Sequence, residues 1–304
     1  MEQALFEFLK TTDAGEASIM FENSIVVKRC VSWADFKSQI EELAKIRKAM
    51  PKQDLMEELF GESLYRGHRD ANWRLSTTLE RTTSEQMKVS TYYLLLSAIH
   101  KHLITCGVRD VPQAITSFPE IQKAISDERP LPSLALLIFL RHLGFPSPLL
   151  DWTRSPYIAA FFAFQGCREE DNVAVYCFLE KQAKSTMSTR DNPNRIVEMG
   201  VIGEYVATHK RHFLQQSNYT LCLARDCENH AAQEFASYEA HLANNGEDFP
   251  EAIIIKFVVP GSEKTRALQE LDKMNINAYS LFGSEEALVE TLFNREILLK
   301  NTAK

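Results

Sequence analysis

The chain has 304 residues, of which 45% are hydrophobic and 25% are charged, and its formal net charge is −7. A chain of this length and ordinary composition can bury a full hydrophobic core. Its 11 glycines and 11 prolines are too few for a collagen-like or low-complexity protein. Proteins that bind long nucleic acid through its phosphates are usually basic, so the net charge argues against that class.

The start of the chain lacks the basic and apolar regions of a secretory signal. The longest apolar run, Leu134 to Leu140, is too short to cross a bilayer. The six cysteines form no CxxC pair, which is typical of reduced cytosolic thiols. Cys222, Cys227 and His230 lie close in sequence but match no zinc-site spacing, so we predict no metal site. We expect a cytoplasmic protein that has no membrane partner.

In the first half of the chain, the residue pattern predicts a strand over 25–27 and a helix from 33 to about 50, capped by Ser32. A loop over 60–66 enters a strand that Gly67 ends. A helix is expected from 84 to about 106, with Tyr92, Leu95, Ile99 and Leu103 on one face. An apolar helix follows over 134–143.

In the second half, Pro156 opens a buried helix that runs to 165, and a strand follows over 172–178. Residues 181–196 look like a loop, 213–223 like a strand and 228–244 like a helix. A central strand over 253–259 precedes a helix over 263–274, a strand over 278–281 and a helix over 284–293. Strands and helices do not alternate evenly, so we predict the α+β class. No glycine-rich phosphate loop is present, which argues against P-loop and Rossmann cofactors.

Four segments carry a family resemblance: Tyr65–His68 with Trp73–Leu75 and Leu79–Arg81; Arg141–Thr153 continuing into Ser155–Pro156 and Ala159–Ala163; Arg211–Gln215 with Ser217 and Tyr219–Thr220; and Ile253–Pro260. Together they resemble the FRG domain family of bacteria and phages. The resemblance implies a single FRG domain over residues 1–304, with a helical lead-in over 1–55 and a helical insertion over 82–142. It also implies a link to mobile elements and antiviral defence, with a partner protein in such a system.

The chain departs from the family at Ser147–Pro148, where relatives usually carry Thr-Arg. If that arginine contacts a phosphate in relatives, the contact is absent here or is supplied by Arg154. The departure therefore bears on how a phosphate is held rather than on the fold.

The same segments resemble, more distantly, the ADP-ribosyltransferase fold, which implies a central mixed or antiparallel sheet and NAD as substrate. Tyr65–Gly67 corresponds to its Arg-Gly strand, and Thr153–Ser155 to the strand before an Ala- and Phe-rich helix. Where that group carries a catalytic glutamate, this chain has Gln215 and Gln216. Asp151 is the best substitute carboxylate by position, with Glu204 and Glu234 behind it. The resemblance leaves open whether a protein, a nucleic acid or a small molecule is modified.

These comparisons give a set of candidate site residues. An arginine on a strand can bind phosphate oxygens bidentately, and an adjoining glycine lets a ligand approach the backbone. A hydroxyl can hold a ribose, and a histidine can titrate near neutral pH. We assign catalytic roles to Arg66, His68, Asp151 and Gln215, and cofactor binding to Arg66, Gly67, Trp152, Thr153 and Ser155.

Each candidate also has a structural interpretation. Arg66 can form a salt bridge, His68 can be a turn or core residue, and Gln215 can be a buried amide. Asp151, Thr153 and Ser155 can cap the helix that begins at Pro156, and Trp152 can be a core residue. In these cases the residues stabilise the fold and bind nothing.

Three functions remain open from the sequence. The favoured one is an NAD-using ADP-ribosyltransferase-like defence protein or toxin. The second is a noncatalytic module that recognises a nucleotide or a phage component, and the third is a hydrolase that uses Asp151 and His68. An enzyme needs Arg66, Asp151, Thr153 and Gln215 in one pocket, whereas a hydrolase needs Asp151 and His68 within hydrogen-bond reach.

Overall fold

The structure is a computed structural model. It describes residues 5, 7–9, 21–22, 25–49, 63–83, 86–114, 133–180, 185–189, 192–202, 210–226, 233–238 and 252–298. In these ranges no helix has the length and apolar character needed to cross a bilayer.

The strands are β1 (Phe21–Glu22), β2 (Ile25–Arg29), β3 (Leu64–His68), β4 (Leu149–Thr153), β5 (Asn172–Glu180), β6 (Ser185–Thr189), β7 (Asn192–Ile202), β8 (Ser217–Asp226), β9 (Gln233–Phe235) and β10 (Ala252–Pro260). They form one sheet in the order β1-β2-β10-β5-β3-β4-β8-β7-β6, and β9 pairs with β8. Among these pairs, β2 and β10 run parallel and the others run antiparallel. The α+β class with a mostly antiparallel sheet is confirmed.

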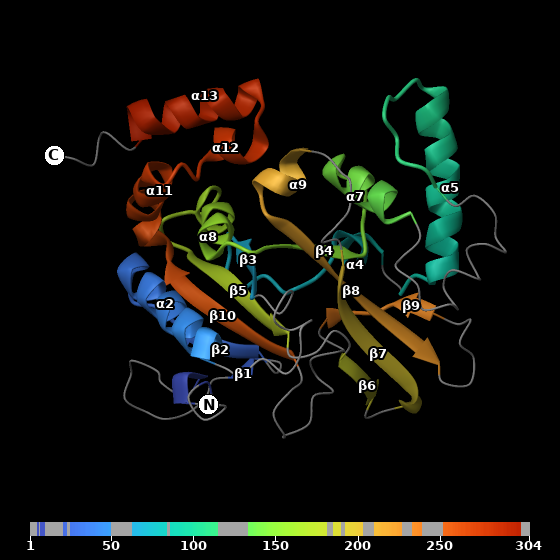
Figure 1. Cartoon of the computed structure of the whole chain (residues 1–304), viewed down its shortest axis with the longest axis horizontal. Coiled ribbons are helices and arrows are strands. Elements are labelled where there is room, and N and C mark those ends of the chain that lie inside the picture. The colour runs from blue at the N-terminus through green and yellow to red at the C-terminus, as the bar shows by residue number, and fades with distance from the viewer. Residues whose placement is uncertain are drawn as a thin grey trace.

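The helices are α2 (Trp33–Ala49), α4 (Thr78–Thr82), α5 (Val89–Thr105), α7 (Leu134–His142), α8 (Pro156–Phe164), α9 (Lys210–Leu214), α11 (Lys264–Lys273), α12 (Ala278–Phe282) and α13 (Glu285–Phe293). A 3-10 turn over Gly261–Glu263 precedes α11, and a π-helical turn over Asn294–Leu298 follows α13. Figure 1 shows α2, α8 and α11 beside the strands β10 and β5, with α5 and α7 beside β8.

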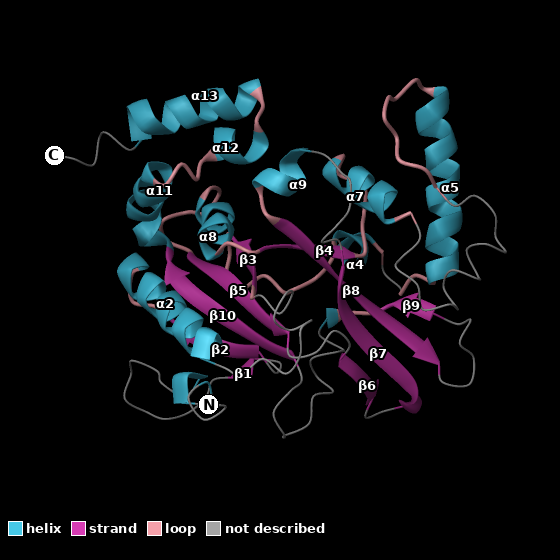
Figure 2. Cartoon of the chain, in the orientation of Figure 1, coloured by secondary structure: helices cyan, strands magenta, loops and turns pink. Residues whose placement is uncertain are grey.

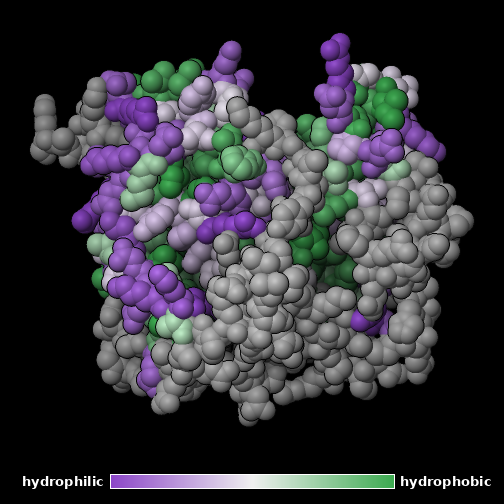
Figure 3. Space-filling view, in the orientation of Figure 1, coloured by the Kyte–Doolittle hydropathy of each residue, from purple (hydrophilic) through white to green (hydrophobic). Residues whose placement is uncertain are grey.

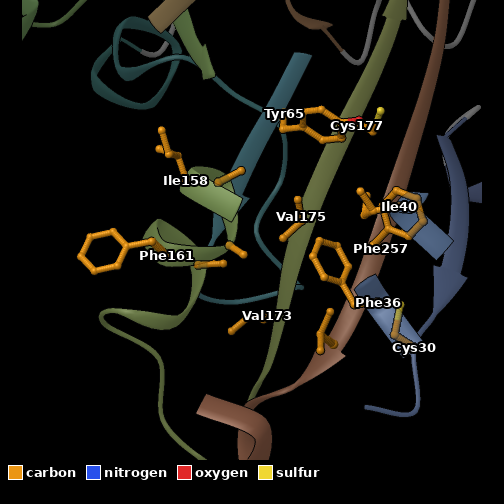
Figure 4. Close-up of a cluster of buried hydrophobic side chains, with 14 of the residues drawn as sticks. Cys30, Phe36, Ile40, Tyr65, Ile158, Phe161, Val173, Val175, Cys177 and Phe257 are labelled. Atoms are coloured by element: carbon orange, nitrogen blue, oxygen red, sulfur yellow. The ribbon is translucent and has the colours of Figure 1, made fainter. Parts of the chain in front are cut away.

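The largest core lies between the sheet and helices α2 and α8. Trp33, Phe36 and Leu43 are fully buried on one stripe of α2. Ile158 and Phe161 of α8 and Val175 of β5 belong to the same cluster. Figure 4 shows Phe36, Ile158, Phe161 and Val175 of this cluster near the strands β5 and β10. Burial of this apolar stripe fixes α8 against β3, which positions the loop and strands around the candidate site.

The sheet consists of two groups of strands that meet at β3 and β4 (Figure 2). Each of these two strands pairs fully along the edge that faces away from the other. β3 pairs with β5 from Leu64 to His68, and β4 pairs with β8 from Leu149 to Thr153. Between β3 and β4 the register contains a single pair, Tyr65 opposite Thr153. The two strands therefore part within one residue of that pair and leave their facing edges without a strand partner.

Several predictions of secondary structure were wrong. Residues 181–196, expected to be a loop, include β6 and part of β7, because the pairing of β6 with β7 and of β7 with β8 outweighs the polar composition. Within the helix predicted over 228–244, residues 233–235 form β9, since they pair with β8, whereas Tyr238 is helical. Residues 278–281 begin α12 instead of a strand, because Asn277 and Ser280 form a capping box.

Two further boundaries moved. Helix α5 begins at Val89, later than the predicted start at 84. Of its predicted face, Tyr92 is buried and Ile99 and Leu103 pack against the same core cluster, whereas Leu95 is 41% exposed. The expected strand over 213–223 is β8, which begins at Ser217 after α9 and a turn in which Gln216 has a φ of 48°. In the predicted helical lead-in, β2 joins the sheet, and the predicted insertion contains α5 and α7.

Exposed apolar side chains gather on α5 and α13, away from the largest core. The exposed members include Leu94 and Ile104 on α5 and Val289 and Phe293 on α13. In Figure 3 hydrophobic surface is visible along the upper edge of the molecule, where these helices lie.

Candidate functional site

A cleft of about 1030 Å³ opens where β3 and β4 part. Its walls come from β3 and the turn after it, from β4, and from residues of α4, α7, α8 and β8. Seven of the eight predicted site residues line it: Arg66, Gly67, His68, Asp151, Trp152, Thr153 and Gln215. Arg66, Asp151, Thr153 and Gln215 therefore converge in one pocket, as the enzyme hypothesis requires.

Arg66 spans the gap between the two strands. Its Nη1 donates a hydrogen bond of 2.8 Å to the backbone oxygen of Asp151 and lies 3.8 Å from the Asp151 carboxylate. The bond satisfies a strand-edge carbonyl that has no β3 partner, because β3 and β4 are paired only at Tyr65 and Thr153. Burial, the largest influence, lowers the pKa of Arg66 to about 10, although Asp151 acts in the opposite direction. The guanidinium remains cationic at neutral pH.

Asp151 is held from the other side by Arg141 of α7. Nε and Nη2 of Arg141 donate to the two carboxylate oxygens of Asp151, and Nη1 donates to Thr78 Oγ1 at 3.3 Å. Burial tends to raise the pKa of Asp151, but the charge and hydrogen bonds of Arg141 and the charge of Arg66 outweigh it and lower that pKa. The Asp151 side chain is 45% exposed, so its ionised carboxylate faces the cleft while both of its oxygens bind Arg141.

His68 is bound to the same arginine. Arg66 Nε donates to His68 Nε2 at 3.1 Å. A guanidinium nitrogen only donates, so His68 Nε2 accepts and the ring proton lies on Nδ1. Burial and then the charge of Arg66 lower the pKa of His68 to about 3. His68 is therefore neutral at physiological pH, and it orients Arg66.

The cleft carries a large excess of positive charge. Five arginines line it, namely Arg66, Arg69, Arg74, Arg81 and Arg141. Asp151 is the sole carboxylate among the described residues that line it. Within the described part of the chain, Arg66 Nη2 and the Arg69 guanidinium have no hydrogen-bond acceptor. A concave site with several arginines and unused donors is suited to an anion.

The comparisons with known proteins bear on this cleft. Residues 61–172 match the family model described as the FRG domain. The chain contains an FRG domain. The matched range holds every residue that lines the cleft except Gln215, Ser217 and Tyr219. Comparison with curated proteins and with solved structures found no match.

Gly67 has a structural reason to be a glycine in the FRG domain. A Cβ at this position would lie 1.9 Å from the backbone oxygen of Ala159 and 2.8 Å from the backbone nitrogen of Ala163, both in α8. Gly67 thus lets α8 approach β3 closely, and it also lines the cleft. The ligand approach predicted for Gly67 is untested, whereas its packing role follows directly from these distances.

The strand-to-helix turn of the FRG domain explains three further candidates. Ser155 caps α8, since its Oγ accepts from Ile158 N at 3.3 Å, and it is not among the residues that line the cleft. Thr153 lines the cleft, and its Oγ1 accepts from Ser155 N at 3.2 Å. Arg154 is exposed and is not among the lining residues. Of the hydroxyls proposed for ribose, Thr153 is the one at the cleft.

Trp152 and Gln215 line the cleft while also bonded to the protein. Trp152 is 2% exposed, and its Nε1 donates to Thr220 Oγ1 at 2.8 Å. The Nε2 of Gln215 donates to the backbone oxygen of Leu281 at 3.2 Å, which leaves its Oε1 as an acceptor. The core interpretation of Trp152 is therefore supported by its burial, and Gln215 keeps a polar atom for a ligand.

Sequence reasoning missed several cleft residues of the FRG domain. Arg141, Arg81 and Arg74 stand in the segments that carry the family resemblance but received no role. Trp73 and Arg69 lie in the turn after β3 and were also missed. The signal was the clustering of arginines in those segments. Glu234 lies in β9, outside the residues that line the cleft, and Glu204 falls outside the described residues.

The buried, neutral His68 predicts acid sensitivity of the folded state. Unfolded histidine titrates near 6.5, and the pKa of folded His68 is lowered to about 3. Between these values the unfolded chain binds more protons, so stability is full above about pH 6.5 and falls as pH drops, by up to about 1.4 kcal/mol per unit. Chemical denaturation of the His68→Gln variant should show a shallower loss between pH 6.5 and 4.5, with the exposed His102→Gln as control. An unchanged pH slope in His68→Gln would contradict the neutral state.

Proposed function

We propose that the FRG domain binds a phosphate-bearing nucleotide in the cleft between β3 and β4, with NAD as its natural ligand. The observation that carries this proposal is the charge imbalance: five arginines against one carboxylate, which Arg141 already holds. A pyrophosphate brings two negative charges and several acceptors, which suits the unused donors of Arg66 and Arg69. Acidic proteins can bind such a ligand locally, because a nucleotide needs few cations.

Hydroxyl and amide groups at the cleft support a nucleotide over a simple anion. Thr153 and Ser217 supply hydroxyls, and Gln215 supplies an amide oxygen, within the same pocket as Arg66. Ribose hydroxyls bind such groups as donors and acceptors. The defence role and the partner protein that the family resemblance implies are part of the proposal, and they rest on that resemblance alone.

Titration calorimetry with ADP and with adenosine tests the binding proposal. ADP carries the charge that the arginines need, and adenosine offers the same base and ribose without it. We expect saturable binding of ADP that weakens as salt is raised, and adenosine binding at least about tenfold weaker. Equal affinities for the two ligands, or no binding of ADP at low salt, would overturn the proposal.

A second candidate is ADP-ribosyl transfer, favoured by the convergence of Arg66, Thr153 and Gln215. In this reaction the bond from the NAD ribose to nicotinamide breaks, and nicotinamide leaves with the electron pair. An acceptor nucleophile bonds to the same carbon and gives up its proton. The positive charge that develops is normally stabilised by a carboxylate. Here the Asp151 carboxylate is matched by Arg141 and Arg66, which removes most of its effect on a ligand.

The rate of transfer should therefore be low. Loss of one preorganised electrostatic group typically costs about 2.7–4 kcal/mol in the barrier, or about a hundred- to a thousandfold in rate. Nicotinamide release from NAD, measured beside a calorimetric titration with NAD itself, separates an enzyme from a recognition module. Release above the level of an Arg66→Ala variant supports transfer, and NAD binding without release supports recognition.

The hydrolase alternative receives less support from the geometry. No hydrogen bond joins His68 to Asp151 in the described residues, and Arg66 bonds to both of them instead. A general base needs a free lone pair near the proton that it removes. Arg66 uses the His68 Nε2 lone pair, so His68 has no free lone pair on that nitrogen with which to act as a general base.

A further inference from the structure

Trp73 is an exposed tryptophan at the edge of the cleft. The chain has three tryptophans. Trp33 is fully buried and Trp152 is 2% exposed, whereas Trp73 is 45% exposed and lines the cleft. A large aromatic ring left half in water beside a polar cavity loses the apolar burial that usually holds tryptophan in a fold. Such a ring is therefore available to a ligand.

The position of Trp73 is fixed by its backbone and its neighbours. Its backbone oxygen accepts from the Tyr176 hydroxyl at 3.2 Å, and its backbone nitrogen donates to Asp70 O at 3.2 Å. The Arg69 guanidinium carbon lies 4.8 Å from the ring centroid, and the His68 ring stands edge-on at 6.3 Å. In the described residues the ring has no further aromatic or cationic contact.

The His68 ring contacts both Arg66 and Trp73. Arg66 Nε bonds to the His68 ring at 3.1 Å, and the same ring lies against Trp73. One imidazole thus separates the guanidinium from the indole. In a nucleotide, one ribose separates the base from the phosphate. A ligand whose phosphate meets Arg66 Nη2 would bring its base to Trp73.

We propose that Trp73, with Arg69 beside it, is the stacking surface for the nucleobase of the ligand. The inference deepens the proposed function and rests on it. Bases stack on tryptophan faces and on arginine planes, each stack contributing roughly tenfold to a hundredfold in affinity. The alternative is that Arg69 and Trp73 only stabilise each other, but an exposed cation–π pair contributes little to stability.

The test compares ADP with inorganic pyrophosphate by calorimetry, for the wild type, Trp73→Ala and Trp73→Phe. Pyrophosphate reports the arginine site without a base. We expect the wild type to bind ADP about tenfold to a hundredfold more tightly than pyrophosphate. Trp73→Ala should lose the preference for ADP and keep its pyrophosphate affinity. Trp73→Phe should retain most of the preference for ADP. Melting temperatures of the variants show whether each is folded.

The outcomes separate the two proposals. If the wild type binds pyrophosphate and ADP equally, or if Trp73→Ala keeps the ADP preference, the stacking surface is overturned and the anion site stands. If neither ligand binds the wild type, the proposed function fails and the stacking surface with it. As a second readout, ADP should shield Trp73 from acrylamide quenching, because the other two tryptophans are already buried. Unchanged quenching with bound ADP would contradict the stacking surface.

Discussion

Replacing Arg66 by alanine should weaken ADP binding by about tenfold to a hundredfold. Arg66 lies at the split between β3 and β4, and its Nη2 has no acceptor among the described residues. A hydrogen bond to a charged group contributes about 1.5–3 kcal/mol, which corresponds to that loss of affinity. The ADP affinity of Arg66→Lys should lie between those of the wild type and Arg66→Ala. An ammonium keeps the charge but cannot bind His68 and Asp151 O as the planar guanidinium does. Calorimetry of the folded variants measures both.

The matched control for this loss is Arg266→Ala. Arg266 lies on α11, its side chain is 59% exposed, and it is not among the residues that line the cleft. The two alanine variants have the same net charge, so a general charge effect would weaken ADP binding in both. We expect wild-type affinity from Arg266→Ala. Binding of ADP by Arg66→Ala at wild-type affinity would show that the ligand is held elsewhere.

Replacing Gly67 by alanine should destabilise the fold by about 3 kcal/mol. The added Cβ would lie 1.9 Å from the backbone oxygen of Ala159, and a helix backbone cannot move aside as a flexible side chain can. Relief requires α8 to shift from β3, which opens the core shared by Ile158 and Val175. Denaturant unfolding of the wild type and the variant gives the difference in the free energy of unfolding.

Gly200→Ala is the control for the Gly67 experiment. Gly200 also lies in a strand, β7, and a Cβ there would meet no atom within 4 Å. We expect a change of about 0.5 kcal/mol or less for this variant. Equal stability of Gly67→Ala and Gly200→Ala would contradict the close packing of α8 on β3.

The sequence predicted the parts of the fold in which local signals agree with burial. Helix α2 follows from its apolar stripe and the Ser32 cap, whose Oγ accepts from Asp35 N at 3.1 Å. Helix α8 follows from Pro156 at its first turn and from the Ser155 cap. Prediction failed where pairing partners decide the structure. The polar strands β6 and β7 form through contact with each other and with β8, which no local pattern reveals.

Residue types and the family resemblance predicted which residues form the candidate site. They did not predict the hydrogen bonds and ion pairs among those residues. Arg66, Asp151 and Gln215 were expected to meet, and they line one cleft. The pairing of Asp151 with Arg141 depends on how α7 packs beside β4, so their sequence positions alone do not reveal it. That pair changes the interpretation of Asp151 from a free carboxylate to the link between two arginines.

The most direct test of nucleotide binding in the cleft is a crystal structure of the chain with ADP bound. We expect a phosphate oxygen within hydrogen-bond distance of Arg66 Nη2, between β3 and β4, while Asp151 remains paired with Arg141. ADP bound away from this cleft, or an empty cleft in crystals that contain ADP at saturating concentration, would contradict it.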